Sequence, residues 1–227
     1  MNLLREYIRE ILNDSIPVGA IYCDMDGVLV DFEAGAIALV NETLLAAREP
    51  GWTSTSKSIR SSVRRVWREL GEGYLLSPGD DLRANKGIKN LSYSLIGKDP
   101  GTFFRSLPPF EDGVRLLWPF LNSLGVPVHI LSAPISGVGP GGSAEDGKRD
   151  WAKILTPQPA SVIIASAVEK PMYAMDMSTG KPNVLVDDKE SAVSAWNSPE
   201  SGGDPYGILH FPGDSMSTIQ RLQRLGL

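Results

Sequence analysis

The chain has 227 residues, 42% of them hydrophobic, and a formal net charge of −5. This length and composition predict a folded protein of one or two compact units. The acidic balance excludes a protein that coats duplex nucleic acid, because such binding requires a basic surface that neutralises phosphates. The single cysteine, Cys23, excludes an intramolecular disulfide and a cysteine-rich zinc site.

The first residues predict an amphipathic helix. Apolar side chains recur at helical spacing in residues 3–12, within an N-terminal segment 1–17. This segment lacks the apolar core of a secretory signal, and no run of 18 apolar residues occurs, so we expect a cytoplasmic protein. Packing of the helix on its own domain is the favoured interpretation, and docking to a partner or a membrane surface stays open.

The next elements change from a strand to a helical insertion. Residues 20–23 (AIYC) predict a buried strand that runs into the turn DMDG, and a helix follows at 32–48. The chain changes character over residues 50–108, which include a polar helix in WTSTSKSIRSSVRRVWREL, and residues 33–108 predict an inserted, mostly helical cap.

The second half predicts alternating helices and strands. Helices are expected at 114–125, 150–155 and 190–196, and strands at 126–134, 160–166, 183–188 and 206–212. Clusters of Gly, Ser and Pro predict loops at 136–147 and 198–207.

This alternation predicts the fold class. Continuous apolar strands separated by helices are typical of an α/β fold, a Rossmann-like parallel sheet with helices on both faces. The core would comprise residues 18–32 and 109–227, with 33–108 as the cap. Ligands bind such sheets at the carboxyl ends of the strands. The residues expected at those ends are Asp24, Asp26, Ser132, Ser166, Lys170, Asp187 and Asp188.

These residue types suit phosphate chemistry. Carboxylates are common ligands of Mg²⁺, so Asp24 and an aspartate of VLVDD are expected to share such an ion. Asp24 and Asp26 are two residues apart and so point to the same side of an extended chain. One can attack phosphorus while the other transfers protons. Ser132 and backbone amides after Asp24 can bind phosphate oxygens, and Lys170 can offset negative charge.

Four segments resemble a known superfamily. DMDGVLVDF, the strand end LSAP, a lysine ahead of the last acidic run, and VLVDD resemble, in that order, the four motifs of the haloacid dehalogenase (HAD) superfamily of phosphatases. DMDGVLVDFEAG, FFRSLPPFEDG, the spacing from Lys148 to Trp151, and VLVDD are similar to the 5′(3′)-deoxyribonucleotidase family. The resemblance spans residues 20–212 and excludes the N-terminal helix.

The resemblance implies a role for each matched residue. Asp24 matches the nucleophile and Asp26 the general acid/base, whose main-chain carbonyl also binds Mg²⁺. Ser132 and the turn at Gly27 match the phosphate-binding positions. The remaining matches are the active-site lysine Lys170, the metal-binding Asp188 with Asp187 beside it, and the nucleoside-contacting Phe32. Trp67 and either Phe103 or Phe104 are expected to contact the base from the cap, and Lys148 is expected to serve either a phosphate or a loop.

The expected activity is removal of phosphate from a nucleoside monophosphate, so the expected partner is a small molecule. Neither a membrane nor duplex nucleic acid is expected as a partner. Whether the protein forms a homodimer stays open. Sugar phosphates and nucleic acid 3′ ends are alternative substrates. A non-catalytic module that recruits a partner through the N-terminal helix is the alternative from another class.

Several residues keep two interpretations. Lys181 competes with Lys170 for the role of the active-site lysine, because the interval from Lys170 to Asp187 is long for the family. Asp187 and Asp188 also suit the N-cap of a helix at 190–196. Trp67, Phe103 and Phe104 also suit a hydrophobic core.

A second phosphate-binding motif is disfavoured. The stretch GGSAEDGK fits the phosphate-binding loop of nucleotide kinases, but Arg149 stands where that loop needs Ser or Thr.

Overall fold

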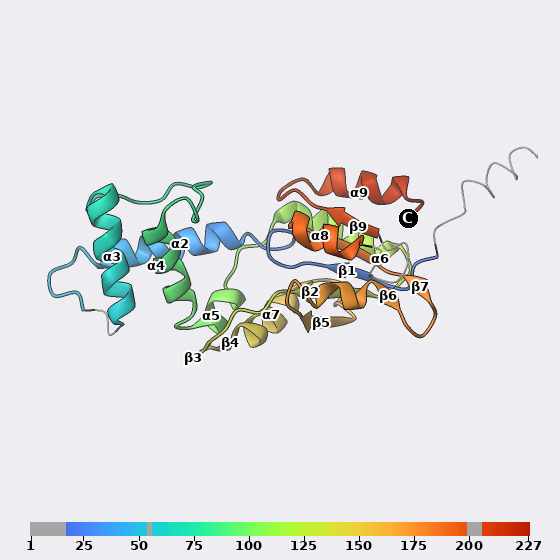
Figure 1. The fold of residues 1–227 in the computed structure, drawn as a ribbon, viewed down its shortest axis with the longest axis horizontal. Coiled ribbons are helices and arrows are strands. Elements are labelled where there is room, and N and C mark those ends of the chain that lie inside the picture. Colours follow the sequence, from blue (N-terminus) through green and yellow to red (C-terminus); the bar gives the residue numbers. More distant parts are fainter. Residues whose placement is uncertain (1–16, 54–55, 199–205) are drawn as a thin grey trace, which may run out of the picture. The chain divides into compact units, whose positions relative to one another are not determined.

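The computed structural model describes residues 17–53, 56–198 and 206–227 (Figure 1). The helix predicted at 3–12 lies outside these residues. The chain divides into two compact units. Within the described residues, unit 1 comprises 17–30, 109–133, 152–198 and 206–227, and unit 2 comprises 31–53, 56–108 and 134–151. The segment 33–108, expected to form a cap, falls within unit 2 together with 134–151.

Unit 1 is built on a five-stranded parallel sheet in the order β5-β2-β1-β8-β9. Its strands are β1 (Ile21–Cys23), β2 (Val128–Ser132), β5 (Ser161–Ile164), β8 (Val184–Asp187) and β9 (Tyr206–Leu209). The short β1 is central, because Ile21 pairs with Val128 on one side and with Val184 on the other. The sheet therefore contains the strands that apolar runs predicted.

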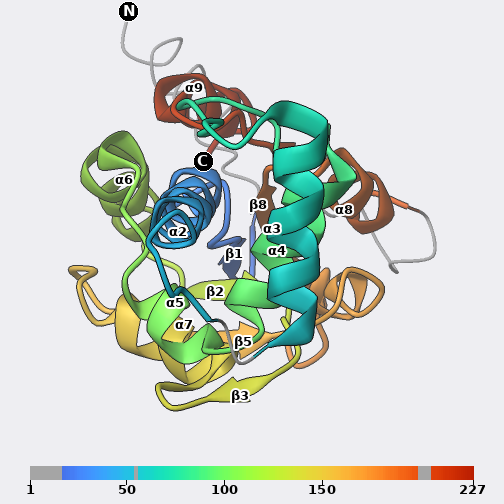
Figure 2. The ribbon, with the colours of Figure 1, turned by 90° about the vertical axis from the view of Figure 1, so that its left-hand side faces the viewer.

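Helices cover both faces of this sheet. Figure 2 shows α6 (Trp118–Ser123) and α9 (Ser215–Arg224) on one face and α8 (Glu190–Trp196) on the other. A π-helical segment, η1 (Gly113–Leu117), leads directly into α6. On the α8 face, Trp196 and Leu185 belong to a fully buried cluster against which Tyr22 packs. The predicted α/β class, a Rossmann-like parallel sheet with helices on both faces, is confirmed.

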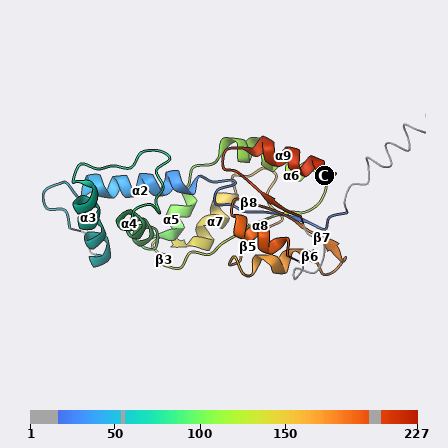
Figure 3. The same cartoon turned by 45° about the horizontal axis from the view of Figure 1, so that its top comes forward.

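The connection from β5 to β8 is irregular. It consists of a 3₁₀ turn, η2 (Lys170–Tyr173), and an antiparallel hairpin of β6 (Met175–Asp176) and β7 (Lys181–Pro182). Figure 3 shows this hairpin beside the start of the described chain. The connection matters for the site because η2 begins with Lys170.

Unit 2 is mostly helical. Its elements are α2 (Phe32–Ala46), α3 (Lys57–Leu70), α4 (Lys86–Ile96), α5 (Pro100–Arg105), the hairpin β3 (Val138–Gly139) and β4 (Gly142–Ser143), and α7 (Ala144–Ala152) up to Trp151. Of the helices that the structure describes in either unit, none is both long and apolar enough to cross a membrane.

The predicted loop at 136–147 is wrong in part. It contains the β3–β4 hairpin and the first turn of α7, so the helix expected at 150–155 begins at Ala144. Two reciprocal hydrogen bonds fix this start: Ser143 N donates to Asp146 Oδ2 at 2.8 Å, and Asp146 N donates to Ser143 Oγ at 3.2 Å. This is the geometry of a capping box.

Candidate active site

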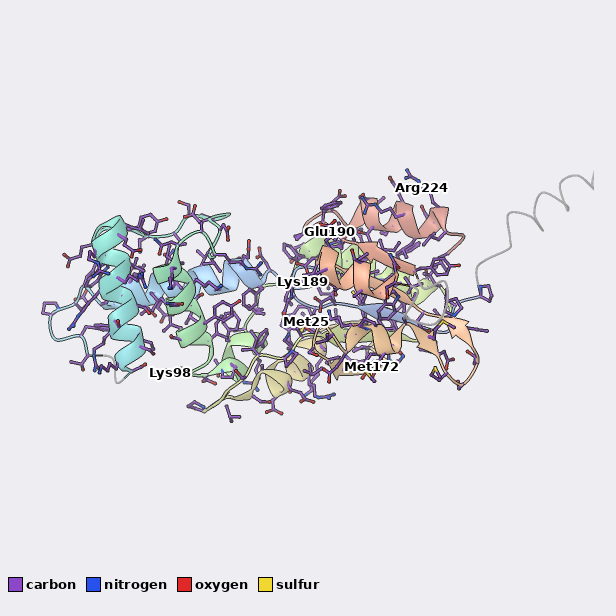
Figure 4. All side chains as sticks on the ribbon, in the orientation of Figure 1. Met25, Lys98, Met172, Lys189, Glu190 and Arg224 are labelled. Atoms are coloured by element: carbon purple, nitrogen blue, oxygen red, sulfur yellow. The ribbon has the colours of Figure 1, made fainter. Side chains whose placement is uncertain are left out.

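Three carboxylates meet at the carboxyl edge of the sheet. Asp24 directly follows β1, Asp187 ends β8, and Asp188 comes next. One oxygen from each of the three lies within 4.8 Å of the others. They meet because β1 and β8 are adjacent parallel strands that end at the same edge. Figure 4 labels Met25 and Lys189, the residues that follow them, at the same end of unit 1.

Lys170 places a positive charge beside these carboxylates. Its Nζ lies 2.6 Å from Asp187 Oδ2 and 3.2 Å from Asp24 Oδ1, and all three side chains are buried. Burial opposes the charged form of Lys170, but Asp24 and Asp187 outweigh it and raise its pKa. Lys181, the competing lysine, is an exposed residue of β7.

Glu169 positions the turn that presents Lys170. Its Oε2 accepts hydrogen bonds from Ser166 N at 2.8 Å and from Ser166 Oγ at 2.7 Å. The Ser166 hydroxyl, expected as one of the polar groups at the strand ends, is therefore used to hold this turn. Sequence reasoning missed Glu169, although Ser-x-x-Glu just before a helical turn is a recognisable capping signal.

The carboxylates repel one another. Burial, followed by Asp24 and Asp187, raises the pKa of Asp188 to about 7. Burial and Asp24 also raise the pKa of Asp187, against the opposite effect of Lys170. The buried Asp188 Oδ1 forms no hydrogen bond to any described residue. Lys189 and Lys170 lower the pKa of Asp188, but their effect is smaller than that of burial and the neighbouring carboxylates.

The donor set fits Mg²⁺. All the converging atoms are carboxylate oxygens, which are the ligands of hard divalent cations. Asp24, Asp187 and Asp188 could hold such an ion, with the unpartnered Asp188 Oδ1 as the clearest ligand atom.

The turn after Asp24 brings Asp26 and Gly27 to the same edge. Gly27 has φ +83°, and its N donates to Val30 O at 3.0 Å. A Cβ at this position would lie 2.4 Å from Asp188 Oδ2. Glycine is therefore needed for the backbone conformation and for the approach of Asp188. Asp26, two residues beyond Asp24, is partly exposed.

The interpretation of Asp187 and Asp188 as the N-cap of α8 is wrong. Lys189 is the N-cap of α8, and this helix has no side-chain cap hydrogen bond. Asp187 Oδ1 instead accepts from Lys189 N at 2.8 Å, while Oδ2 accepts from Lys170. Both oxygens of Asp187 are therefore held within the site.

Ser132 ends β2, the other neighbour of β1, and is fully buried. Its carbonyl accepts from Ala165 N at 3.0 Å. The strand end thus lies at the same edge of the sheet as Asp24.

The other predicted substrate residues belong to unit 2. The Phe32 ring centroid lies 5.4 Å from that of Phe103 and 6.2 Å from that of Phe104. Lys148 is fully buried, and its Nζ lies 4.4 Å from the Phe104 ring centroid. Trp67 lies on α3 and is partly buried. These contacts are internal to unit 2, and a role in substrate binding stays a prediction.

Comparisons identify the fold. No family model and no curated protein matches the sequence. A hydrolase from Streptococcus pneumoniae TIGR4 is similar in structure, with 13% identity, a TM-score of 0.50 and coverage of 90% of this chain and 98% of that chain. The chain has a HAD-like Rossmann-type fold. At this identity, the likeness concerns the fold alone.

Two further solved structures resemble this HAD-like chain. The haloacid dehalogenase-like family protein SP0104 from Streptococcus pneumoniae has 16% identity and a TM-score of 0.42, with 89% of this chain and 99% of that chain covered. YfnB from Bacillus subtilis, a candidate HAD hydrolase bound to magnesium, has 14% identity and a TM-score of 0.48, with 91% and 99% covered.

Proposed function

We propose that this HAD-like protein is a Mg²⁺-dependent phosphomonoester hydrolase that acts through an aspartyl phosphate on Asp24. The observation that supports this proposal most strongly is the convergence of Asp24, Asp187 and Asp188 within 4.8 Å beside the buried Lys170. A buried acidic cluster of this kind is costly unless it performs a task or binds a cation.

The proposed reaction has two displacements. In the first, a carboxylate oxygen of Asp24 forms a bond to phosphorus as the bond from phosphorus to the ester oxygen breaks, and Asp26 gives its proton to that leaving oxygen. In the second, Asp26 removes a proton from water, and the resulting oxygen attacks phosphorus. The bond to Asp24 then breaks, inorganic phosphate leaves, and both aspartates return to their starting states.

The neighbouring residues bind and balance charge. Lys170 offsets negative charge on Asp24 and Asp187, with which it is paired. Ser132 and the backbone amides of the turn at Gly27 are proposed to bind phosphate oxygens. When bound to Asp24, Asp187, Asp188 and the Asp26 carbonyl, Mg²⁺ supplies Lewis-acid stabilisation of the phosphoryl oxygens.

The proposed substrates are deoxyribonucleoside monophosphates. Two features support this choice: the similarity of DMDGVLVDFEAG and FFRSLPPFEDG to the 5′(3′)-deoxyribonucleotidase family, and the cluster of Phe32, Phe103 and Phe104 with Lys148 in unit 2. Phe32 is the partly exposed member of this cluster and is proposed to lie against the nucleoside, since aromatic rings stack on bases.

Phosphate release from a substrate panel tests both levels of the proposal. The full-length protein with Mg²⁺ is assayed on deoxyribonucleotides, ribonucleotides, hexose phosphates and a 3′-phosphorylated oligonucleotide. Highest kcat/KM on a deoxyribonucleoside monophosphate is expected. Preference for a sugar phosphate or an oligonucleotide end would overturn the substrate assignment and leave the hydrolase assignment standing.

Two matched variants test the mechanism. The wild type is expected to form an acid-stable phosphoryl adduct, to be detected by intact-protein mass spectrometry. Asp24→Asn is expected to abolish both this adduct and turnover. Asp31→Asn is the control from the same acidic stretch, because Asp31 caps α2 through a 2.8 Å hydrogen bond from Ala34 N and asparagine is an equally good cap. Normal turnover in Asp24→Asn would refute the aspartyl phosphate.

A further inference from the structure

Exposed apolar side chains gather on one part of unit 1. Val168 is 87% exposed, Met172 76% and Met177 90%. They line a groove of about 840 Å³ between η2, the β6–β7 hairpin and α8, which also includes Met175 and Ala195. Figure 4 labels Met172 on this surface. We refer to this groove, lined by Val168, Met172, Met175, Met177 and Ala195, as the methionine groove.

The methionine groove suits an apolar helix better than a polar ligand. It contains three of the six methionines of the chain, and methionine side chains adapt to irregular partners. The acidic residue on its lining, Asp176, is already used: Oδ1 accepts from Ser178 N and Oγ, and Oδ2 accepts from Thr179 Oγ1. The pKa of Asp176 is lowered to about 2 by these bonds.

The described chain begins beside this groove. Gly19 N donates to Pro182 O of β7 at 2.9 Å. A Cβ on Gly19 would lie 2.8 Å from Cβ of Asp176, which lines the groove. Figures 1 and 3 show the start of the described chain next to β6 and β7. The described chain therefore begins at the edge of the groove.

The preceding segment carries a matching apolar stripe. Its members, at helical spacing, are Leu3, Leu4, Tyr7, Ile8, Ile11 and Leu12. As a helix, residues 3–12 would be about 15 Å long. Residues 13–16 can span at most about 14 Å, so such a helix would start close to the point where the described chain begins. The charged residues Arg5, Glu6, Arg9 and Glu10 would remain on the opposite side.

We propose that residues 3–12 bind as a helix in the methionine groove of their own chain, with the apolar stripe against Met172, Met175 and Met177. The tether at Gly19 makes this an intramolecular contact, which raises the effective concentration of the segment at the groove. The segment then covers apolar side chains that the described residues leave exposed.

Methyl NMR with a spin label tests the proposal on the full chain. Glu6→Cys carries a nitroxide on the charged side of the segment, and the native Cys23 stays unlabelled because it is fully buried. The methionine methyls are ¹³C-labelled and assigned by single Met→Leu substitutions. The nitroxide is expected to broaden Met172, Met175 and Met177 severalfold more than Met216 on α9, which lies on the opposite face of the sheet.

Controls separate the proposed contact from its rivals. Adding Ile8→Asp to the labelled chain is expected to remove the broadening, whereas Arg9→Gln, on the charged side, is expected to keep it. Equal broadening of Met216, no broadening, or insensitivity to Ile8→Asp would overturn the proposal. Broadening that occurs only when spin-labelled and ¹³C-labelled chains are mixed would also overturn it, since it would assign the groove to a second copy.

Discussion

Replacing Lys170 by methionine should destabilise the metal-free protein more than any exposed substitution. The change replaces the aliphatic stem by an unbranched apolar chain and removes the ammonium that lies between Asp24 and Asp187. Without it, two buried carboxylates face each other with no cation from the described residues between them. The free energy of unfolding in the presence of EDTA is the quantity to measure.

The magnitude follows from burial. The side chains of Lys170, Asp24 and Asp187 are 2%, 1% and 0% exposed, so solvent screens their interactions little. Removing one partner of such a buried pair costs about 3–5 kcal/mol. The remaining carboxylates can reduce this cost by taking up a proton, and the pKa of Asp187 is already raised. We expect a loss of about 3 kcal/mol at neutral pH that becomes smaller as the pH falls.

Urea unfolding, followed through the buried Trp118 and Trp196 of unit 1, provides the assay. Lys181→Met is the matched control, because Lys181 is exposed and its loss should stay within about 0.5 kcal/mol. Lys170→Met should also lose turnover, and Lys181→Met should keep it. A destabilisation by Lys170→Met of less than about 1 kcal/mol, or one equal to that of Lys181→Met, would refute the reasoning.

Three further predictions concern the same unit. Gly27→Ala should lower the free energy of unfolding by about 1–2 kcal/mol because of the φ of +83°. It should also weaken Mg²⁺ binding in calorimetric titrations, because the added Cβ would displace Asp188. The control Gly213→Ala, with φ +78° and open space around its Cβ, should show only the loss of stability. Mg²⁺ at 100 times its Kd should stabilise the protein by about 2.7 kcal/mol, and Asp188→Asn should reduce this gain; an unchanged Tm on adding Mg²⁺ to the wild type would contradict the metal site. Burial lowers the pKa of His210 despite the opposite effects of Asp112 and Asp214. As the pH falls below about 6.5, the unfolded chain therefore takes up the proton more readily than the folded chain, and stability decreases as the pH falls. His210→Gln should flatten this dependence in urea titrations between about pH 5 and 7, roughly the range in which histidine titrates.

The cluster of aspartates at one edge of the sheet could be predicted, because these residues stand at the carboxyl ends of strands. An apolar run followed by Asp24, and another followed by Asp187 and Asp188, are visible in the sequence, and parallel strands bring their carboxyl ends together. The contact distances depend on which strands are neighbours. The pairing of β1 with β8 places these aspartates side by side, and no local pattern specifies that pairing.

The lysine could not be chosen from the sequence. Lys170 and Lys181 both precede VLVDD, and two irregular elements decide which of them reaches the carboxylates. The β6–β7 hairpin turns Lys181 outward, and the turn held by Ser166 and Glu169 presents Lys170. Apolar periodicity carries no information on such short irregular elements. The start of α7 does have a local signal in the sequence, the capping pair Ser143 and Asp146. The prediction was wrong because this pair stands among glycines that suggest a loop.

The central position of β1 also constrains the order in which the protein can fold. Ala20 N is bonded to Asn183 Oδ1, 163 residues later, and Ile21 pairs with Val128 and Val184. During translation at about 5–20 residues per second, residues 31–108 are made long before those partners. The middle strand therefore waits with both edges unpaired until β2 has been synthesised, and with one edge unpaired until β8 follows. Contacts of such long range slow folding, so a chain truncated before residue 184 would keep an apolar strand exposed and be prone to aggregation.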